Sequence, residues 1–282
     1  MIYFEKLQGA GNDFIIFNGN KEELPSLSKL AKEVCDRHFG IGADGMIVVA
    51  QSKIADVKMI FYNADGSIAP MCGNGIRCFG KYVYDKGIVD KENFDVETLA
   101  GIIKIDILKG NKEDSIDRIK VNMGKASFDT SKFPIKTDKE QFIEEDININ
   151  NKMFKITALL MGTIHTVVFV DDLEEIDISE LGFYIENLPI FPEKTNVNFC
   201  EIIDDHNLKV ITWERGVGQT LACGTGSTAV AITSQKINRT SDRVNIHVLG
   251  GSLEIENTND GVYMTGPAEL ICTGYYNESI EE

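Results

Sequence analysis

Positive charge is scarce in this chain. Its 282 residues include 28 Lys and Arg against 44 Asp and Glu, which gives a formal net charge of −16, and no cluster of basic residues offsets that balance. The resulting negative field repels polyanions, so nucleic acid is excluded as a partner. Otherwise the acidity indicates only a soluble protein.

Long apolar runs are also missing. No stretch approaches the roughly 18 apolar residues that a membrane span requires, and Glu5 and Lys6 interrupt the amino-terminal segment where a signal peptide would be apolar. We therefore expect no membrane association and a cytoplasmic location. In that compartment the cysteines at 35, 72, 78, 200, 223 and 272 should be reduced thiols.

The cysteine spacings of common metal and redox sites are absent as well. There is no Cys-x-x-Cys motif. Cys72 with Cys78 could suggest metal binding, but zinc sites usually have two cysteines two to four residues apart with further Cys or His nearby, and neither Cys223 nor Cys272 has such a partner. The cytoplasmic setting disfavours a structural disulfide. Burial is the ordinary role of a single thiol. We assign it to Cys35, Cys78, Cys200 and Cys272.

The chain does contain Cys-Gly-x-Gly twice, in "MCGNGIRC" (71–78) and "ACGTGSTA" (222–229), and Cys223 follows Cys72 at an offset of 151 residues. The same offset superposes three further pairs, Gly11 on Gly162, Lys58 on Lys209 and Asn63 on Glu214. An offset kept over this distance predicts two halves of equivalent topology. We place the first domain at residues 1–120 plus 267–282 and the second at 121–266.

Secondary structure follows the same repeat. Short segments rich in β-branched and aromatic residues predict strands in both halves. A helix is predicted after each Cys-Gly-x-Gly, within 74–87 and 225–236, and Gly87 is a suitable end for the first. Further helices are expected at 26–38 and 178–187. The crossover between the halves should lie within 109–151.

A thiol placed just before a helix is surrounded by backbone N–H groups and the positive end of the helix dipole. Both favour the thiolate, and the same N–H groups bind carboxylates. Two such thiols on equivalent domains could act on opposite faces of one carbon, one removing a proton while the other delivers one. An amino-acid carboxylate between the helix ends would stabilise the negative charge that develops.

The chain resembles the diaminopimelate epimerase family over nearly its whole length. The motifs that carry the resemblance are "GAGNDF" (9–14), "HFGIGADG" (38–45), "YNADGS" (62–67), "MCGNGIRC", "TNVNF" (195–199), "WERGVG" (213–218), "ACGTG" (222–226), "GGSLEI" (250–255) and "YMTG" (263–266). The family converts LL-2,6-diaminopimelate to the meso isomer, a step in the synthesis of lysine and peptidoglycan precursors. The resemblance implies an α+β fold of two pseudo-symmetric domains. Each would be a β-barrel-like sheet around a central helix, with the active site in the interdomain cleft. It also implies a homodimer, no pyridoxal phosphate and no metal.

Family roles carry over to matching positions. Cys72 and Cys223 would be the acid–base pair, and His165 and Glu214 would orient or activate the thiols. Backbone N–H groups for the reacting carboxylate would come from Gly73, Asn74, Gly224 and Thr225. The substrate would be held by Asn12, Asn63, Asn196, Glu214 and Arg215. The Arg215 guanidinium is the natural bidentate partner for a distal carboxylate.

Structural roles remain open for several of these side chains. An isolated histidine such as His165 is often structural, and His38 could brace the loop that follows it. Asn12 and Asn63 could satisfy turns. Glu214 and Arg215 could form a surface pair.

The segment "MGTIHT" (161–166) departs from the family, which usually has Asn-Pro where this chain has Thr163 and Ile164. The departure affects recognition of the distal end of the substrate and leaves the thiols intact. Racemisation of another amino acid, such as histidine, is therefore the alternative activity. A thiol redox sensor is a third hypothesis, although it gives the Asn, Arg and Glu residues no purpose.

Overall fold

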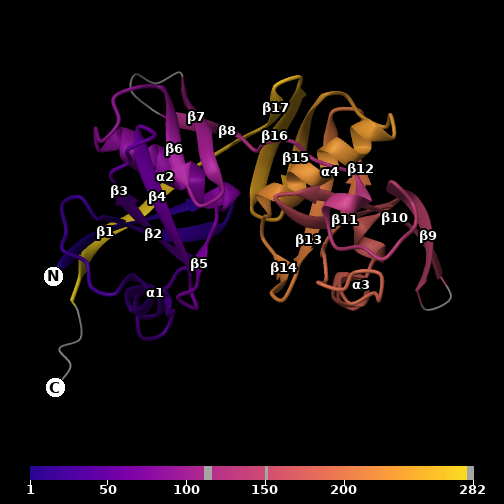
Figure 1. Cartoon of the computed structure of the whole chain (residues 1–282), viewed down its shortest axis with the longest axis horizontal. Helices are drawn as coiled ribbons and strands as arrows, with labels where there is room; N and C mark the ends of the chain where they lie inside the picture. The colour runs from indigo at the N-terminus through magenta and orange to yellow at the C-terminus, as the bar shows by residue number, and fades with distance from the viewer. Residues whose placement is uncertain (111–115, 150–151, 278–282) are drawn as a thin grey trace. The chain divides into compact units, whose positions relative to one another are not determined.

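Strands dominate the computed structural model, which describes residues 1–110, 116–149 and 152–277 (Figure 1). The chain divides into two units, Met1–Asn122 with Thr265–Glu282, and Met123–Met264. Within the described residues, no helix combines the length and apolar character needed to cross a membrane.

The first unit holds eight of its strands in one continuous order of pairing, β18-β1-β2-β3-β4-β6-β7-β8, and β5 pairs with β4. Pairs β2–β3 and β4–β6 are parallel and the others are antiparallel. Its elements are β1 (Ile2–Gly9), β2 (Asn12–Asn18), α1 (Leu27–Cys35), β3 (Gly45–Ala50), β4 (Val57–Asn63), β5 (Ile68–Ala69), α2 (Gly73–Asp85), β6 (Asn93–Thr98), β7 (Gly101–Lys109), β8 (Ile116–Asn122) and β18 (Glu269–Tyr276).

The second unit repeats this arrangement. Its pairing order is β9-β10-β11-β12-β13-β15-β16, β14 pairs with β13, and the parallel pairs are β11–β12 and β13–β15. Its elements are β9 (Phe142–Ile149), β10 (Lys152–Met161), β11 (Thr163–Val170), α3 (Ile178–Glu186), β12 (Asn196–Ile202), β13 (Asn207–Glu214), β14 (Gly218–Thr220), α4 (Gly224–Lys236), β15 (Arg243–Val248), β16 (Gly251–Thr258) and β17 (Gly261–Gly266), where the chain leaves the unit.

The repeat seen in the sequence is a structural repeat. Helices α2 and α4 begin and end 151 residues apart. The strand register follows the same offset, because Phe14 lies opposite Gly45 in the β2–β3 pair and His165 lies opposite Asn196 in the β11–β12 pair. Residues at this offset therefore occupy equivalent places in their two units.

Each repeat is built around a buried helix. Helix α2 contacts β1, β2, β3, β7 and β8, and α4 contacts β10 to β13, β15 and β16. Most of such a helix is shielded from solvent, so its buried polar side chains depend on partners inside the protein. In α4 the Thr228 and Thr233 hydroxyls donate to carbonyls of the preceding turn, and in α2 the buried Arg77 donates to the carbonyls of Gly73 and Pro267.

The four predicted helices are present, and Gly87 lies after α2 with a φ of 60°, a conformation that glycine adopts without strain. The prediction that Cys272 is buried is wrong. Cys35, Cys78 and Cys200 are buried, whereas Cys272 is exposed. It lies on β18, whose residues are exposed over most of the strand, so its side chain reaches no core.

Candidate active site

Cys72 is the N-cap of α2. Its backbone is extended, with φ −132° and ψ 126°, and the helical hydrogen bonds begin with Ile76 N donating to Cys72 O over 2.8 Å. The amides of the three intervening residues are therefore outside the helical ladder. They lie in the first turn, beside the half-buried thiol, where they and the helix dipole favour negative charge.

Cys223 has the same position at α4. Its φ is −121° and its ψ is 112°, and Ser227 N donates to its carbonyl over 2.9 Å. The thiol is buried, with Sγ 3.4 Å from Thr225 Oγ1. Glycine is required at 226, since a Cβ there would lie 2.3 Å from Asn198 Oδ1. The second Gly of this Cys-Gly-x-Gly motif thus lets the helix approach β12.

Asn12, at the start of β2, lies against Cys72. Its Oδ1 is 3.7 Å from Cys72 Sγ and accepts a hydrogen bond from Asn74 Nδ2 over 3.3 Å. Its Nδ2 donates to Asp44 Oδ2 over 2.5 Å. Three of the predicted site residues in the first unit therefore form one group around the α2 N-terminus.

His165 is fully buried on β11. Asn198 donates from Nδ2 to the Thr166 carbonyl and accepts from the Thr212 hydroxyl at Oδ1, which fixes its amide orientation. The same Nδ2 lies 3.2 Å from His165 Nδ1, so Nδ1 is the acceptor and the ring proton is on Nε2, 3.4 Å from Thr163 Oγ1. Burial, with a smaller contribution from the charge of Arg215, lowers the pKa of His165 to about 3. The ring is neutral at physiological pH.

Asn196 joins the remaining residues of the second unit. Its Nδ2 donates to Thr163 Oγ1 over 2.9 Å and to the Ile164 carbonyl over 3.0 Å, and its Oδ1 accepts from Arg215 N over 3.0 Å. Arg215 is exposed, with Nη1 donating to Glu193 O over 2.8 Å. Thr163 thus contacts both His165 and Asn196.

Asn63 and Glu214 lie at equivalent strand ends, before the β4–β5 and β13–β14 turns. Asn63 Nδ2 donates to Ser67 Oγ over 3.0 Å, and Glu214 Oε1 accepts from Thr220 Oγ1 over 2.7 Å. The turn role that the sequence allowed for Asn63 is therefore present. Glu214 contacts the hairpin beside it, whereas the side chain of its neighbour Arg215 donates to the backbone carbonyl of Glu193, in another loop.

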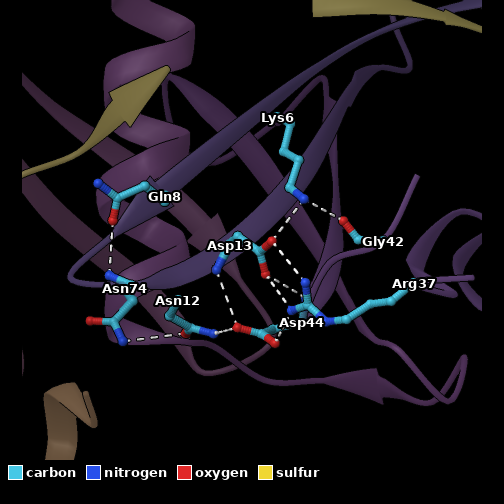
Figure 2. Close-up of polar contacts among 9 residues, drawn as sticks. Lys6, Gln8, Asn12, Asp13, Arg37, Gly42, Asp44 and Asn74 are labelled. Carbon is cyan, nitrogen blue, oxygen red and sulfur yellow. Dashed lines mark hydrogen bonds and ion pairs between the residues drawn. The ribbon is translucent and has the colours of Figure 1, made fainter. Parts of the chain in front are cut away.

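Sequence reasoning missed Asp13, Arg37 and Asp44, whose side chains connect to Asn12 (Figure 2). Asp13 lies in the motif "GAGNDF" and Asp44 in "HFGIGADG", but His38 was the only residue of the latter motif given a possible role. His38 itself is exposed, and its backbone N–H donates to Asp36. Among the described residues there is no group of three or more His, Cys, Asp or Glu arranged to hold a metal ion.

Solved structures of the same fold include a probable proline racemase from Agrobacterium radiobacter K84, which matches with a TM-score of 0.72 at 13% identity, covering 99% of this chain and 94% of that one. A phenazine biosynthesis protein of the PhzF family from Bacillus anthracis matches with a TM-score of 0.69 at 14% identity, covering 97% and 98%. At these identities the likeness shows the fold alone.

Curated relatives are much closer in sequence. The diaminopimelate epimerase of Caldanaerobacter subterraneus subsp. tengcongensis is 47% identical over 96% of this chain and 98% of its own length. That of Alkaliphilus metalliredigens is 44% identical over 99% of each chain. The family described as diaminopimelate epimerase matches residues 4–129 and 157–271. The chain belongs to the diaminopimelate epimerase family.

Proposed function

We propose that this protein epimerises LL-2,6-diaminopimelate to meso-diaminopimelate, using Cys72 and Cys223 as a pair of acid–base groups. The observation that carries the proposal is that both cysteines are N-caps of buried helices at equivalent positions of two repeats. Family membership and nearly complete coverage of curated relatives support the substrate and the reaction. The reaction belongs to lysine biosynthesis.

Inversion proceeds by transfer of one proton at each face of the α-carbon. One cysteine, as the thiolate, takes the α-proton and becomes a thiol, and the electron pair of the C–H bond stays on the substrate. The other cysteine, as the thiol, gives its proton to the opposite face and becomes the thiolate. The cycle leaves the two thiols in exchanged protonation states, so the reverse reaction uses the same groups.

The α-carboxylate must accept much of the charge that forms at the α-carbon. The first-turn amides of Gly73 and Asn74, and those of Gly224 and Thr225, are suited to this because the helical ladders start beyond them. Fixed N–H donors aimed at developing negative charge stabilise a transition state without further reorganisation. We assign the reacting carboxylate to these amides.

His165 acts as a neutral, fixed group in this scheme. Its lowered pKa and its contact with Asn198 argue against a histidine that carries protons during turnover. We propose that His165 and Glu214 orient the reacting groups and that the two thiols alone exchange protons with carbon. Asn12, Asn63, Asn196 and Glu214 would hold the rest of the substrate.

The distal carboxylate of diaminopimelate is assigned to Arg215. The side chain is exposed and donates from Nη1 to Glu193 O, and a guanidinium has five N–H donors, so it can hold that carbonyl and still bind a carboxylate. Thr163 supports this end of the site by accepting from Asn196, which in turn accepts from the Arg215 backbone. Thr163 thus occupies the place of the usual Asn while remaining part of the same hydrogen-bonded group.

Homodimerisation and a cytoplasmic location are also proposed, on the family resemblance alone. The small-molecule partner is the amino-acid substrate. Sedimentation at micromolar concentration tests the dimer, and a monomer that is fully active would contradict it.

The activity is tested by NMR in D₂O with the reduced protein and, separately, LL-diaminopimelate, L-histidine and L-lysine. We expect α-proton exchange to be fastest with LL-diaminopimelate and to yield the meso isomer. Faster exchange of histidine would favour the alternative racemase. Exchange with none of the three, while oxidant still joins the two thiols reversibly, would favour the redox sensor.

A further inference from the structure

The carboxylates of Asp13 and Asp44 connect the start of β2 to the start of β3. Asp13 N donates to Asp44 Oδ2 over 3.2 Å, and Asp44 N donates to Asp13 Oδ1 over 3.0 Å. Each aspartate therefore accepts from the backbone of the other, at the point where the parallel pair β2–β3 begins. These two hydrogen bonds fix the distance between Asp44 and Asn12, the residue before Asp13.

Two cations balance this pair of carboxylates (Figure 2). Arg37 Nη2 lies 2.8 Å from Asp13 Oδ1 and 2.7 Å from Asp44 Oδ1, and Lys6 Nζ lies 2.9 Å from Asp13 Oδ2. Burial acts to raise the pKa of Asp13, but its hydrogen bonds and charge interactions with Arg37 and Lys6 outweigh burial and hold the pKa below its usual value. Arg37 also directs the two oxygens of Asp44, because Oδ1 faces Arg37 while Oδ2 faces Asn12.

This arrangement determines which end of the Asn12 amide faces Cys72. An ionised carboxylate can only accept hydrogen bonds, so Asp44 must face the Asn12 nitrogen. The Asn12 oxygen is then left facing Cys72 Sγ at 3.7 Å and Asn74 Nδ2 at 3.3 Å. The contact with Asn74 supports the same orientation of the Asn12 amide, since Asn74 Nδ2 is a donor.

We propose that Asp44 is a positioning residue that holds the Asn12 amide with its carbonyl oxygen towards the Cys72 thiol, and so stabilises the protonated form of Cys72. A carbonyl oxygen can accept from S–H, whereas it repels a thiolate. Asp44 thus opposes the first-turn amides of α2, which favour the thiolate. The consequence for catalysis rests on the proposed function, because it concerns the thiol that would act as the acid.

Other groups near Cys72 do not depend on Asp44. Arg77, buried in the same helix, interacts electrostatically with Cys72 and favours its thiolate, and the buried Cys78 also interacts electrostatically with Cys72. The second unit lacks an equivalent of the Asn12–Asp44 hydrogen bond. At the offset of 151 residues, Thr163 replaces Asn12 and Thr195 replaces Asp44, and Thr195 Oγ1 lies 3.0 Å from Thr166 Oγ1. The two thiols are therefore expected to differ in their protonation.

The test uses Asp44→Asn, Asn12→Ala and the double variant, in the full chain. In Asp44→Asn the charge of Arg37 favours an oxygen on its side of the new amide, so the new NH₂ group faces Asn12 and the bond from Asp13 N is lost. Asn12 must then turn its oxygen to position 44 and its NH₂ group to the thiol. The readout is the pH dependence of iodoacetamide alkylation at Cys72, followed by mass spectrometry of the tryptic peptide 59–77, which contains no other cysteine. Alkylation does not require turnover, so failure of the proposed function would not alter this readout.

We expect Asp44→Asn to lower the midpoint of the Cys72 profile by about half to one pH unit, as loss of a hydrogen bond to the neutral form predicts. In the Asn12→Ala background the same change at 44 should have less than about a third of that effect. Equal shifts in both backgrounds would mean that Asp44 acts only by its charge. No shift in either would mean that Asp44 does not influence the protonation of the Cys72 thiol. Both results overturn the proposal.

The matched control is Asp56→Asn. Like Asp44, which pairs with Arg37, Asp56 forms an ion pair, here with Lys91, and it accepts from the backbone N–H of Asp95. Its substitution should leave the Cys72 profile unchanged. The profile of Cys223, read from the tryptic peptide 216–236, should also be unchanged in every variant. If Asp44→Asn does not fold, as judged by circular dichroism, comparison of the wild type with Asn12→Ala still tests the proposal, because loss of the acceptor alone should lower the midpoint.

Discussion

Asn198 donates a hydrogen bond to Nδ1 of His165 across 3.2 Å, in a part of the second unit where both side chains are fully buried. Thr212 and the Thr166 carbonyl fix the amide, so the histidine has one tautomer available. A group fixed in this way can orient its neighbours. It is poorly suited to gaining and losing protons during turnover.

The burial of neutral His165 predicts a pH dependence of stability. The unfolded histidine titrates near pH 6.5, and the folded one has a pKa of about 3. Below pH 6.5 the unfolded chain therefore binds a proton that the folded chain does not, and stability falls as the pH drops towards 3. Between pH 7 and pH 5 the advantage of the wild type over His165→Gln in unfolding free energy should shrink by about 2 kcal/mol. Denaturant titrations measure it, and parallel curves for the two proteins would mean that His165 is not held neutral.

Replacing either cysteine of the pair should abolish isomerisation without unfolding the protein. Serine is far less acidic than cysteine, so Cys72→Ser and Cys223→Ser each lack a usable base or acid at neutral pH. Either variant should still eliminate halide from a suitable β-halogenated substrate isomer, because elimination needs one base only. Cys272→Ser removes an exposed thiol and is the control that should retain activity. Near-normal epimerisation by either of the first two variants would contradict the two-base mechanism.

Oxidation should inactivate the enzyme reversibly. Two thiols that act on one carbon must come within a few ångströms of each other, close to the distance at which a disulfide forms. Diamide should therefore abolish activity and dithiothreitol should restore it, and peptide mapping should find Cys72 joined to Cys223. Activity that is indifferent to the oxidant would mean that the thiols do not approach each other or do not catalyse.

Much of this site could be predicted because its determinants are local. Cys-Gly-x-Gly before a helical pattern places each thiol at a helix N-terminus, and the 151-residue offset carries one site onto the other. The predicted helices appear where the residue pattern and Gly87 placed them. None of these features depends on knowing which distant residues of the chain contact one another.

The missed features depend on contacts between distant residues. Asp44 reaches Asn12 only because β2 and β3 pair in parallel, and nothing in "HFGIGADG" reveals that pairing. Cys272 was expected to be buried because burial is the ordinary role of a single thiol, but exposure is decided by what covers β18. The role of Thr163 was similarly invisible, since its partners His165 and Asn196 meet only in the β11–β12 ladder.

Arg215→Lys separates recognition of the distal carboxylate from general organisation of the site. A guanidinium binds a carboxylate through two parallel hydrogen bonds, and a lysine keeps the charge but loses the fork. Charge-assisted hydrogen bonds of this kind contribute about 1.5–3 kcal/mol, so kcat/KM for diaminopimelate should fall roughly ten- to a hundredfold. Any turnover of L-histidine, which has no distal carboxylate, should fall much less. Equal losses on both substrates would remove Arg215 from distal recognition.

The position of deuterium after partial conversion tests the two-base mechanism most directly. Reduced wild-type protein is mixed with LL-diaminopimelate in D₂O and quenched at a few per cent conversion, and the LL and meso isomers are separated and analysed by mass spectrometry. If one cysteine removes the proton and the other delivers one from solvent, the meso product should carry one deuterium at its inverted carbon, while the remaining LL substrate should carry almost none. Substrate that gains deuterium as fast as product forms, or product that keeps the original proton, would show that a single base serves both faces and would contradict the account.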